Sequence, residues 1–276
     1  MQITDTLQLI NGVKIPQLGF GTYQLKEGTE VEQAVQWALE TGYRHIDTAT
    51  IYRNERGVGN AIKSSGVPRD QIFVTTKVWN DAQRNGYDAV LKAFDESMSK
   101  LQLDVLDLYL VHWAIPGMYT EAWRALEHLY EQKRVRAIGV SNFYMHHLND
   151  VFASAKVQPM VNQIELHPRL IPIDVVELCK QKKIIVEAWS PLMAGRLGEL
   201  KEVAQIAERH GKTSAQVVLR WNLQHGWVTI PKSARKERIE ENTKLYDFEL
   251  SAAEMTAIDG LDQQKRIGPH PDKVNF

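Results

Sequence analysis

Short apolar runs alternate along the chain with segments in which apolar residues recur every three or four positions. The runs predict strands at 17–23, 44–47, 72–79, 106–113, 135–141, 160–166, 184–190 and 227–233. Strands that are buried on both faces read as continuous apolar runs, whereas a spacing of three and four marks one face of a helix. The alternation therefore predicts a parallel α/β sheet covered by helices.

The helical segments follow the strands one by one, at 31–39, 55–65, 90–101, 122–130, 145–155 and 172–181, with two in succession at 200–210 and 213–225. Gly42 is expected to end the first helix as a C-cap. Thr213 and Gln216 form a predicted capping box. Eight strands, mostly about 25 to 35 residues apart, favour a (β/α)8 TIM barrel over an open sheet.

Both ends of the sequence add to this repeat. Residues 7–10 and 13–15 flank Asn11-Gly12 and predict a β-hairpin, which we expect to plug one end of the barrel. Ser251 and Glu254 predict the capping box of an extra helix near the C-terminus. The irregular tail 266–276 is expected to lie across a barrel mouth. No linker divides the chain, so residues 1–276 are expected to form one domain.

Four chemically active side chains stand near the ends of three successive strands. Asp47 ends the second strand, Lys77 lies near the end of the third and His112 near the end of the fourth. A buried lysine needs a partner, which Asp47 is expected to supply. Tyr52 leaves the same strand end as Asp47 in a loop. Active sites of parallel barrels lie at these carboxyl ends, so the four groups are expected to converge.

The remaining strand ends are also polar or aromatic. The polar residues are Ser141, Asn142, Gln163, Ser190, Lys232 and Ser233, and the aromatic ones are Tyr23, Trp79, Trp113 and Trp189. Aromatic walls suit flat ligands. Lys232, Ser233, Arg235 and Arg238 cluster at a helix start, which favours an anion such as phosphate. The dinucleotide-binding fingerprint is absent, because Gln24 stands where its third glycine would be.

Motifs along nearly the whole chain resemble the aldo-keto reductase superfamily, and within it short bacterial reductases similar to 2,5-diketo-D-gluconate reductase. In order, they are GYRHIDTATIYRNERGVG, TTKVWN, LDLYLVHW, IGVSNF, VNQIELHP, EAWSPL and IPKSARKERIEEN. The resemblance implies an enzyme that reduces aldehydes and ketones to alcohols with NADPH. It identifies Asp47, Tyr52, Lys77 and His112 as the catalytic residues.

The resemblance also implies the binding residues. Those for the cofactor are Ser141, Asn142, Gln163, Trp189, Ser190, Leu192, Lys232, Ser233, Arg238, Glu241 and Asn242, to which the phosphate cluster adds Arg235. The substrate is expected to contact Tyr23, Trp79, His112 and Trp113. No metal site is expected: His45 and Asp47 share a strand face, but Lys77 would repel a cation. His146 and His147 are interpreted as a solvated pair.

The chemistry gives each catalytic residue an expected role. Carbonyl reduction needs a hydride donor at the carbon and an acid within reach of the oxygen. A free tyrosine, with a pKa of about 10, is a weak acid near neutrality. Lys77 is therefore expected to lower the pKa of Tyr52, Asp47 to hold the ammonium charged, and His112 to orient the substrate oxygen.

The expected substrates are small carbonyl compounds. An aromatic, largely uncharged entrance favours small aldehydes and α-dicarbonyls such as methylglyoxal. Diketo sugar acids are the alternative, if Arg196, Arg266 or His270 draws an acid to the rim. Two other functions stay open on the residues alone. One is a lyase that forms a Schiff base on Lys77, and the other is a non-catalytic nucleotide-binding barrel.

Composition limits the partners. The chain has 276 residues, of which 33 are basic and 34 acidic, without a run of like charge that would suggest nucleic acid. No apolar stretch reaches the roughly 18 residues of a membrane span, and no signal segment begins the chain. The single cysteine, Cys179, falls on a helical pattern and is expected to be buried. The chain is therefore expected to be a cytoplasmic monomer that binds small molecules.

Overall fold

The structure is a computed structural model that describes residues 1–274 and 276, and it contains two sheets. A small antiparallel sheet pairs β1 (Thr6–Gln8) with β2 (Lys14–Pro16). The large sheet is parallel, and its strands lie in sequence order. They are β3 (Phe20–Gly21), β4 (His45–Asp47), β5 (Phe73–Val78), β6 (Leu106–Val111), β7 (Val135–Ser141), β8 (Val161–Glu165), β9 (Ile185–Trp189) and β10 (Val228–Thr229).

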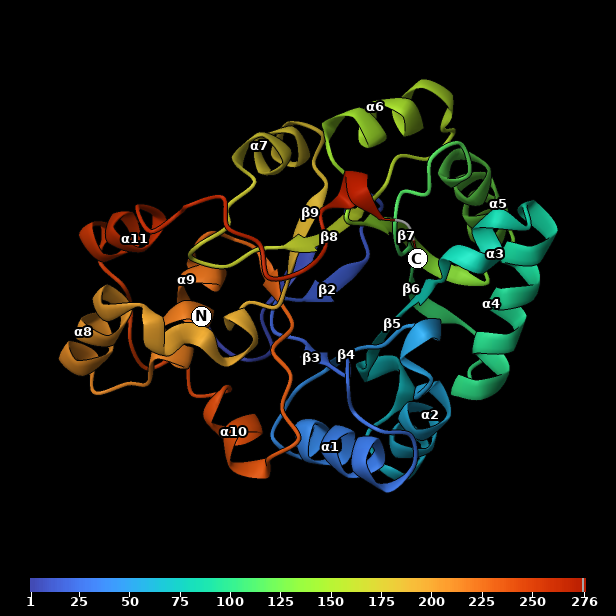
Figure 1. Ribbon diagram of the computed structural model, residues 1–276. Helices are drawn as coiled ribbons and strands as arrows, with labels where there is room; N and C mark the ends of the chain where they lie inside the picture. The colour runs from blue at the N-terminus through green and yellow to red at the C-terminus, as the bar shows by residue number, and fades with distance from the viewer. Residues whose placement is uncertain (275) are drawn as a thin grey trace.

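Helices surround the large sheet on its outer side (Figure 1). The α-helices are α1 (Thr29–Glu40), α2 (Glu55–Ser64), α3 (Asn80–Arg84), α4 (Tyr87–Leu101), α5 (Tyr119–Glu131), α6 (Met145–Ser154), α7 (Ile173–Gln181), α8 (Lys201–His210), α9 (Ser214–Gln224), α10 (Lys236–Glu241) and α11 (Ala252–Asp259). Short 3-10 helices are η1 (Thr50–Tyr52), η2 (Arg69–Gln71), η3 (Met193–Glu199) and η4 (Pro271–Lys273). Both predicted capping boxes, at Thr213 and Ser251, are present.

The large sheet curls until its two edges meet. The amide of Gly19 donates to the oxygen of Thr229 at 2.9 Å, and the amide of Thr229 donates to the oxygen of Gln17 at 3.0 Å. The amide of Gly21 donates to the oxygen of Pro231 at 3.1 Å. These bonds join the chain around β3 to the chain around β10, so the curled sheet encloses its inward-facing side chains.

Seven of the eight predicted strands are shorter in the structure, and two of them are reduced to two residues. The segment 17–23 is a strand only at Phe20–Gly21, and 227–233 only at Val228–Thr229. Pro231 has no amide hydrogen, so it cannot continue the ladder of the last strand. The fourth predicted strand ends at Val111, which places His112 just beyond the sheet.

The predicted hairpin is present at the start of the chain. Leu7 lies opposite Ile15, and Gly12 takes a φ of 88° in the turn, where a glycine is favoured. Ile15 is fully buried, so the hairpin packs against the rest of the protein. That it plugs one end of the barrel stays a prediction.

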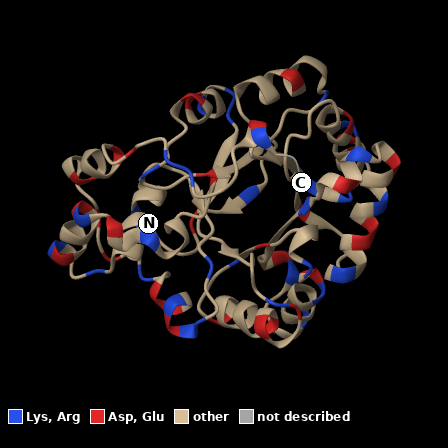
Figure 2. Cartoon of the chain, in the orientation of Figure 1, with Lys and Arg blue, Asp and Glu red and all other residues tan. Residues whose placement is uncertain are grey.

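The strands are buried along their length, as continuous apolar runs require. Every residue of β5 and β6 is buried. Gly139 of β7 allows close packing, because a Cβ there would lie 2.5 Å from the backbone oxygen of Val161. Both acidic and basic residues occur on the outer helices (Figure 2). No helix among the described residues is long and apolar enough to cross a membrane.

Candidate active site

A cavity of about 1150 Å³ opens at the carboxyl ends of the strands. Most of the predicted site residues line it: Tyr23, Asp47, Tyr52, Trp79, His112, Trp113, Ser141, Asn142, Gln163, Trp189, Ser190, Leu192, Lys232, Ser233, Arg238, Glu241 and Asn242. Lys77 and Arg235 are not among its lining residues. The structure thus brings residues from distant parts of the chain to one cavity.

Lys77 lies beneath the cavity floor and is fully buried. Its ammonium donates to Oδ1 and Oδ2 of Asp47 at 2.7 and 2.8 Å, and to the backbone oxygen of Thr48 at 2.8 Å. An ammonium has three hydrogens to donate, so all of them are engaged. The parallel pairing of β4 with β5 places the two residues near the same end of adjacent strands. The predicted Asp47–Lys77 pair is confirmed.

Tyr52 ends η1 directly above this pair. The Lys77 ammonium lies 5.1 Å from the centre of the Tyr52 ring, and the Thr50 hydroxyl anchors η1 to β5 by donating to the backbone oxygen of Lys77 at 2.9 Å. The expected lowering of the Tyr52 pKa is wrong. Burial raises the pKa of this phenol well above its usual value, and the negative charge of Asp47 adds to the rise. Tyr52 therefore keeps its proton at ordinary pH.

His112 faces Tyr52 across the cavity. Its ring centre lies 5.9 Å from that of Tyr52 and 5.2 Å from that of Trp79. Burial, followed by the positive charge of Lys77, holds the pKa of His112 well below its ordinary value. The imidazole is therefore neutral and offers one donor and one acceptor nitrogen.

The opposite wall is joined to the Asp47–Lys77 pair by hydrogen bonds. The indole nitrogen of Trp189 donates to Oδ1 of Asn142 at 2.8 Å. The hydroxyl of Ser141 donates to the backbone oxygen of Gln163 at 3.0 Å, and the Gln163 amide donates to Oδ2 of Asp47 at 2.8 Å. The wall and the floor of the cavity are thereby held in one arrangement.

Two cations lie on the rim near α10. Lys232 and Arg238 line the cavity, and neither forms an ion pair with a described residue. Ser233 lies beside them and accepts the backbone amide of Arg235 through its hydroxyl oxygen at 3.0 Å. Cations without carboxylate partners suit a phosphate or another anion.

The sequence analysis missed Phe276 as a site residue. Its ring stacks on Trp79 at 5.7 Å with an interplanar angle of 6°, and meets Trp113 edge-on at 5.7 Å. The side chains of Asn80 and Arg84 donate to its backbone oxygen. The expected position of the tail is confirmed, because Ile267–Pro269 and Phe276 line the cavity. The sequence did carry one signal for this contact: the tail that was predicted to lie across a barrel mouth contains an aromatic residue.

The cations proposed to attract an acidic substrate are placed differently. Arg266 donates to Oε2 of the buried Glu165 at 3.1 Å and also bonds the hydroxyl of Tyr144. Neither Arg266 nor Arg196 nor His270 is among the residues that line the cavity. The expectation that Arg266 draws an acid to the rim is therefore not supported, since its charge is already paired.

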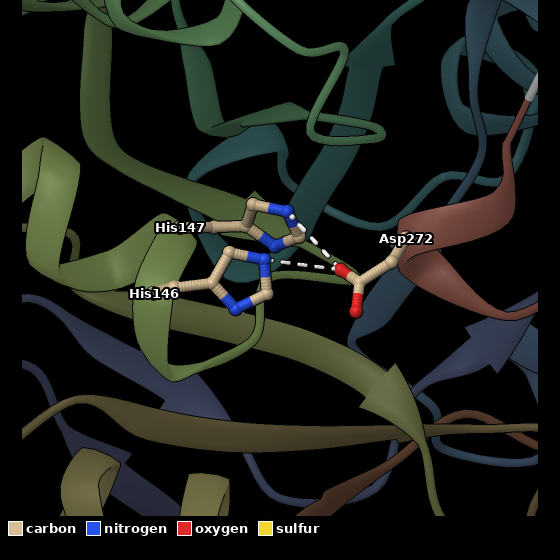
Figure 3. Close-up of side chains that lie close together, drawn as sticks. All are labelled: His146, His147 and Asp272. Atoms are coloured by element: carbon tan, nitrogen blue, oxygen red, sulfur yellow. Dashed lines mark ion pairs between the residues drawn. The ribbon is translucent and has the colours of Figure 1, made fainter.

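The interpretation of His146 and His147 as a solvated pair is wrong for His147, which is buried. His146 and His147 approach Oδ1 of Asp272 through Nε2 at 3.1 and 3.4 Å (Figure 3). His147 accepts the Tyr144 amide at Nδ1, so its Nε2 carries the hydrogen. This nitrogen has no lone pair to offer a metal. The cluster instead ties η4 of the tail to α6.

The sequence analysis also missed Glu187, which points into the curled sheet from β9 and is fully buried. It interrupts an apolar strand two residues before Trp189. An acid in such a run was the available signal, of the same kind that identified Asp47.

The chain matches the Aldo/keto reductase family over residues 17–263. The chain belongs to this family. It is similar to a glyoxal reductase of Bacillus subtilis, with 51% identity and 99% of each chain covered. A 9,11-endoperoxide prostaglandin H2 reductase of Trypanosoma cruzi is 54% identical, with 97% of this chain and 95% of the relative covered. A crystal structure of a Gox0644 variant in complex with NADPH superposes with a TM-score of 0.94 at 40% identity, with 99% of each chain covered.

Membership makes this aldo-keto reductase an oxidoreductase, as the sequence resemblance implied. The four side chains named from the strand ends are the ones that meet around the cavity and beneath its floor. Their grouping depends on the Asp47–Lys77 pair, which can be tested separately from activity.

We expect Asp47→Asn to lower the free energy of unfolding by about 3 to 5 kcal/mol, because it leaves the Lys77 ammonium buried without a counter-ion. Urea unfolding measures the loss. The double variant Asp47→Asn/Lys77→Met should recover much of it, since no unpaired charge remains. Equal losses in the single and double variants would contradict this account of the pair.

Proposed function

We propose that this aldo-keto reductase uses NADPH to reduce small aldehydes and α-dicarbonyls to alcohols, with Tyr52 as the general acid. The observation that carries the proposal is the position of Tyr52 and His112 on the cavity, directly above the buried Asp47–Lys77 pair. The relatives named as reductases support the reaction class, and the NADPH-bound relative supports the cofactor.

The cavity suits a dinucleotide together with a small substrate. Its volume of about 1150 Å³ exceeds that of an ordinary small-molecule site, about 300 to 1000 Å³. Trp189 offers a flat aromatic face, and Ser141, Asn142 and Gln163 offer amide and hydroxyl groups beside it. Lys232 and Arg238 offer positive charge for a phosphate, with Ser190, Leu192, Ser233, Glu241 and Asn242 completing the wall.

When bound, NADPH supplies the hydride that adds to the carbonyl carbon. Tyr52 completes the reduction by giving its phenolic proton to the carbonyl oxygen, so that the product is a neutral alcohol. Because the pKa of Tyr52 is raised, the phenol carries this proton at neutral pH. The nearby Lys77 ammonium would stabilise the phenolate that forms as the proton leaves, and Asp47 keeps the ammonium in place.

His112 would orient the carbonyl oxygen. Its imidazole is neutral, so it would offer a hydrogen bond without competing with Tyr52 as the proton source. Its side chain lies among Tyr52, Trp79 and Trp113, which limits the positions that a carbonyl group could take.

The substrate end of the cavity favours compact, neutral carbonyl compounds. Tyr23, Trp79, Trp113 and Phe276 provide aromatic walls, and the Phe276 ring of the tail stacks on Trp79. Glyoxal, the substrate in the name of one relative, is a small α-dicarbonyl. The other relative is named for a much larger endoperoxide, so a sequence identity of 54% does not by itself determine the substrate.

The geometry weighs against the lyase alternative. A Schiff base requires an uncharged lysine amine that reaches the substrate. Lys77 is not on the cavity surface, and its three hydrogens are engaged by Asp47 and Thr48. The non-catalytic alternative is tested by activity, since turnover of any aldehyde excludes it.

We expect Tyr52→Phe to reduce kcat for carbonyl reduction by at least about a hundredfold, because the general acid is lost. NADPH binding should stay nearly unchanged. Tyr109→Phe is the control, since Tyr109 is buried away from the cavity. NADPH oxidation measured by absorbance gives kcat, and a Tyr52→Phe variant with near wild-type kcat would refute the assignment of the acid.

Arg238→Leu should weaken NADPH binding about tenfold or more, while NADH binding changes little. The reason is the loss of a charge-assisted bond to the 2′-phosphate, worth about 1.5 to 3 kcal/mol. Dissociation constants come from quenching of tryptophan fluorescence. Arg235→Leu is a matched control, because Arg235 does not line the cavity. Equal effects of the two substitutions, or equal affinity of the native protein for NADPH and NADH, would count against this assignment.

A panel of carbonyl compounds tests the substrate class. We expect kcat/KM for glyoxal, methylglyoxal and small aldehydes to exceed that for 2,5-diketo-D-gluconate, because none of the described residues on the aromatic part of the wall is a cation. Apolar walls discriminate by only about 1 to 3 kcal/mol per methylene, so broad activity is expected within the neutral group. A strong preference for the keto acid would overturn the proposal for small neutral substrates but not the reductase activity.

A further inference from the structure

Glu187 is a buried acid that the proposed reaction does not yet use. Its side chain is fully buried inside the curled sheet, and neither carboxyl oxygen has a hydrogen-bond partner among the described residues. In the sheet its Cα lies opposite Gln163 of β8 and Val228 of β10. Gln163 in turn donates to Asp47, so Glu187 lies next to the network that holds the Asp47–Lys77 pair.

The cations around Glu187 are already engaged. Lys77 of β5 uses all its hydrogens on Asp47 and Thr48. His45 of β4 comes within 3.9 Å of Oε1 of Glu187, but its Nε2 lies in hydrogen-bond contact with the hydroxyl of Thr75 at 3.0 Å. Burial lowers the pKa of His45 to about 3, so this ring is neutral.

The charge balance then determines the state of Glu187. Asp47 and Lys77 cancel each other, so an ionised Glu187 would be an unpaired charge in a dry interior. Such a charge is strongly destabilising, and a carboxyl group avoids this by keeping its proton. Gln163 beside it is uncharged, and β10 contributes only Val228 and Thr229. Tyr52, above the pair, is also neutral.

We propose that Glu187 is a positioning residue for the reduction, a neutral carboxylic acid whose protonated state keeps the interior beneath Tyr52 free of a second negative charge. This role rests on the proposed function, although the protonation state does not. Ionised Glu187 would oppose the formation of the Tyr52 phenolate. Oxidation of the alcohol, which requires that phenolate as the base, should therefore be more sensitive to Glu187 than reduction.

The pKa of Glu187 supports this state. Burial, followed by the charge of Asp47, raises it from 4.5 to about 8, and these effects outweigh the opposing influence of the Lys77 charge and the Gln163 amide. Between these values the folded protein holds a proton that the unfolded chain has released. Folding stability from this group is greatest below pH 4.5, declines as pH rises through the window, and levels off above about 8.

Thermal unfolding of Glu187→Gln tests the protonation state without any need for activity. Glutamine keeps the size of the side chain but cannot ionise. We expect Tm of the variant minus Tm of the native protein to rise steadily from pH 5 to pH 8. Asp107→Asn is the matched control: Asp107 is a buried acid paired with Arg69 and Arg136, and its Tm difference should not rise with pH. A constant difference for Glu187→Gln would overturn the neutral acid.

The pH dependence of alcohol oxidation with NADP+ tests the positioning role. The alcohol is the product of the best carbonyl substrate in the panel. At pH 9 we expect Glu187→Gln to exceed the native kcat by up to about tenfold, the effect of a shift of about one unit in the pKa of Tyr52. Superimposable pH profiles would overturn the role in the reaction and leave the Tm result standing.

If Glu187→Gln does not fold, the native protein labelled with ¹³C at glutamate carboxyl groups decides the protonation state. One carboxyl resonance should titrate near pH 8. Titration of every glutamate below pH 6 would overturn the proposal. A protein that shows this resonance but reduces no carbonyl compound would refute the proposed function alone.

Discussion

The active site depends on one ion pair in the interior of the curled sheet. Lys77 is fully buried, and a lone ammonium at that depth would be strongly destabilising. Asp47 and the backbone oxygen of Thr48 engage all its hydrogens, so the charge stays fixed in position. Tyr52 and His112 take their electrostatic environment from this pair. Burial, together with the negative charge of Asp47, raises the pKa of Tyr52, and burial, together with the positive charge of Lys77, lowers the pKa of His112.

The interior around the pair is arranged as a balance of charges and hydrogen bonds. Gln163 reaches from β8 to Asp47, and the same residue accepts the hydroxyl of Ser141 through its backbone oxygen. A change on the cavity wall at Ser141 or Gln163 would therefore affect Asp47 beneath the cavity floor. Among the described residues, Lys77 and His45 near Glu187 are already engaged, so ionisation of the Glu187 carboxyl group in β9 would raise the pKa of Tyr52.

The repeat of strands and helices, and the convergence of Asp47, Lys77 and His112, could be predicted because strand ends in a parallel sheet meet at one edge. The direction in which the Tyr52 pKa shifts could not be predicted, because it depends on burial and on which oxygens the Lys77 hydrogens reach. The contact of Phe276 with Trp79 could not be predicted either, because the tail is irregular and has no periodic pattern that would indicate which distant segment it packs against. Arg235 and Arg238 read alike in the sequence, and only the turn into α10 separates the residue on the cavity from the one outside it.

Closure of the sheet has a consequence for how the protein folds. The bonds that join the edges link the start of the sheet to its end, and Gln17 contacts Leu223 across 206 residues of chain. Contacts of such long range form slowly, because a large loop must close before they stabilise anything. During synthesis β3 therefore emerges long before β10, and its free edge stays open to pairing with other chains until the last quarter of the protein has left the ribosome.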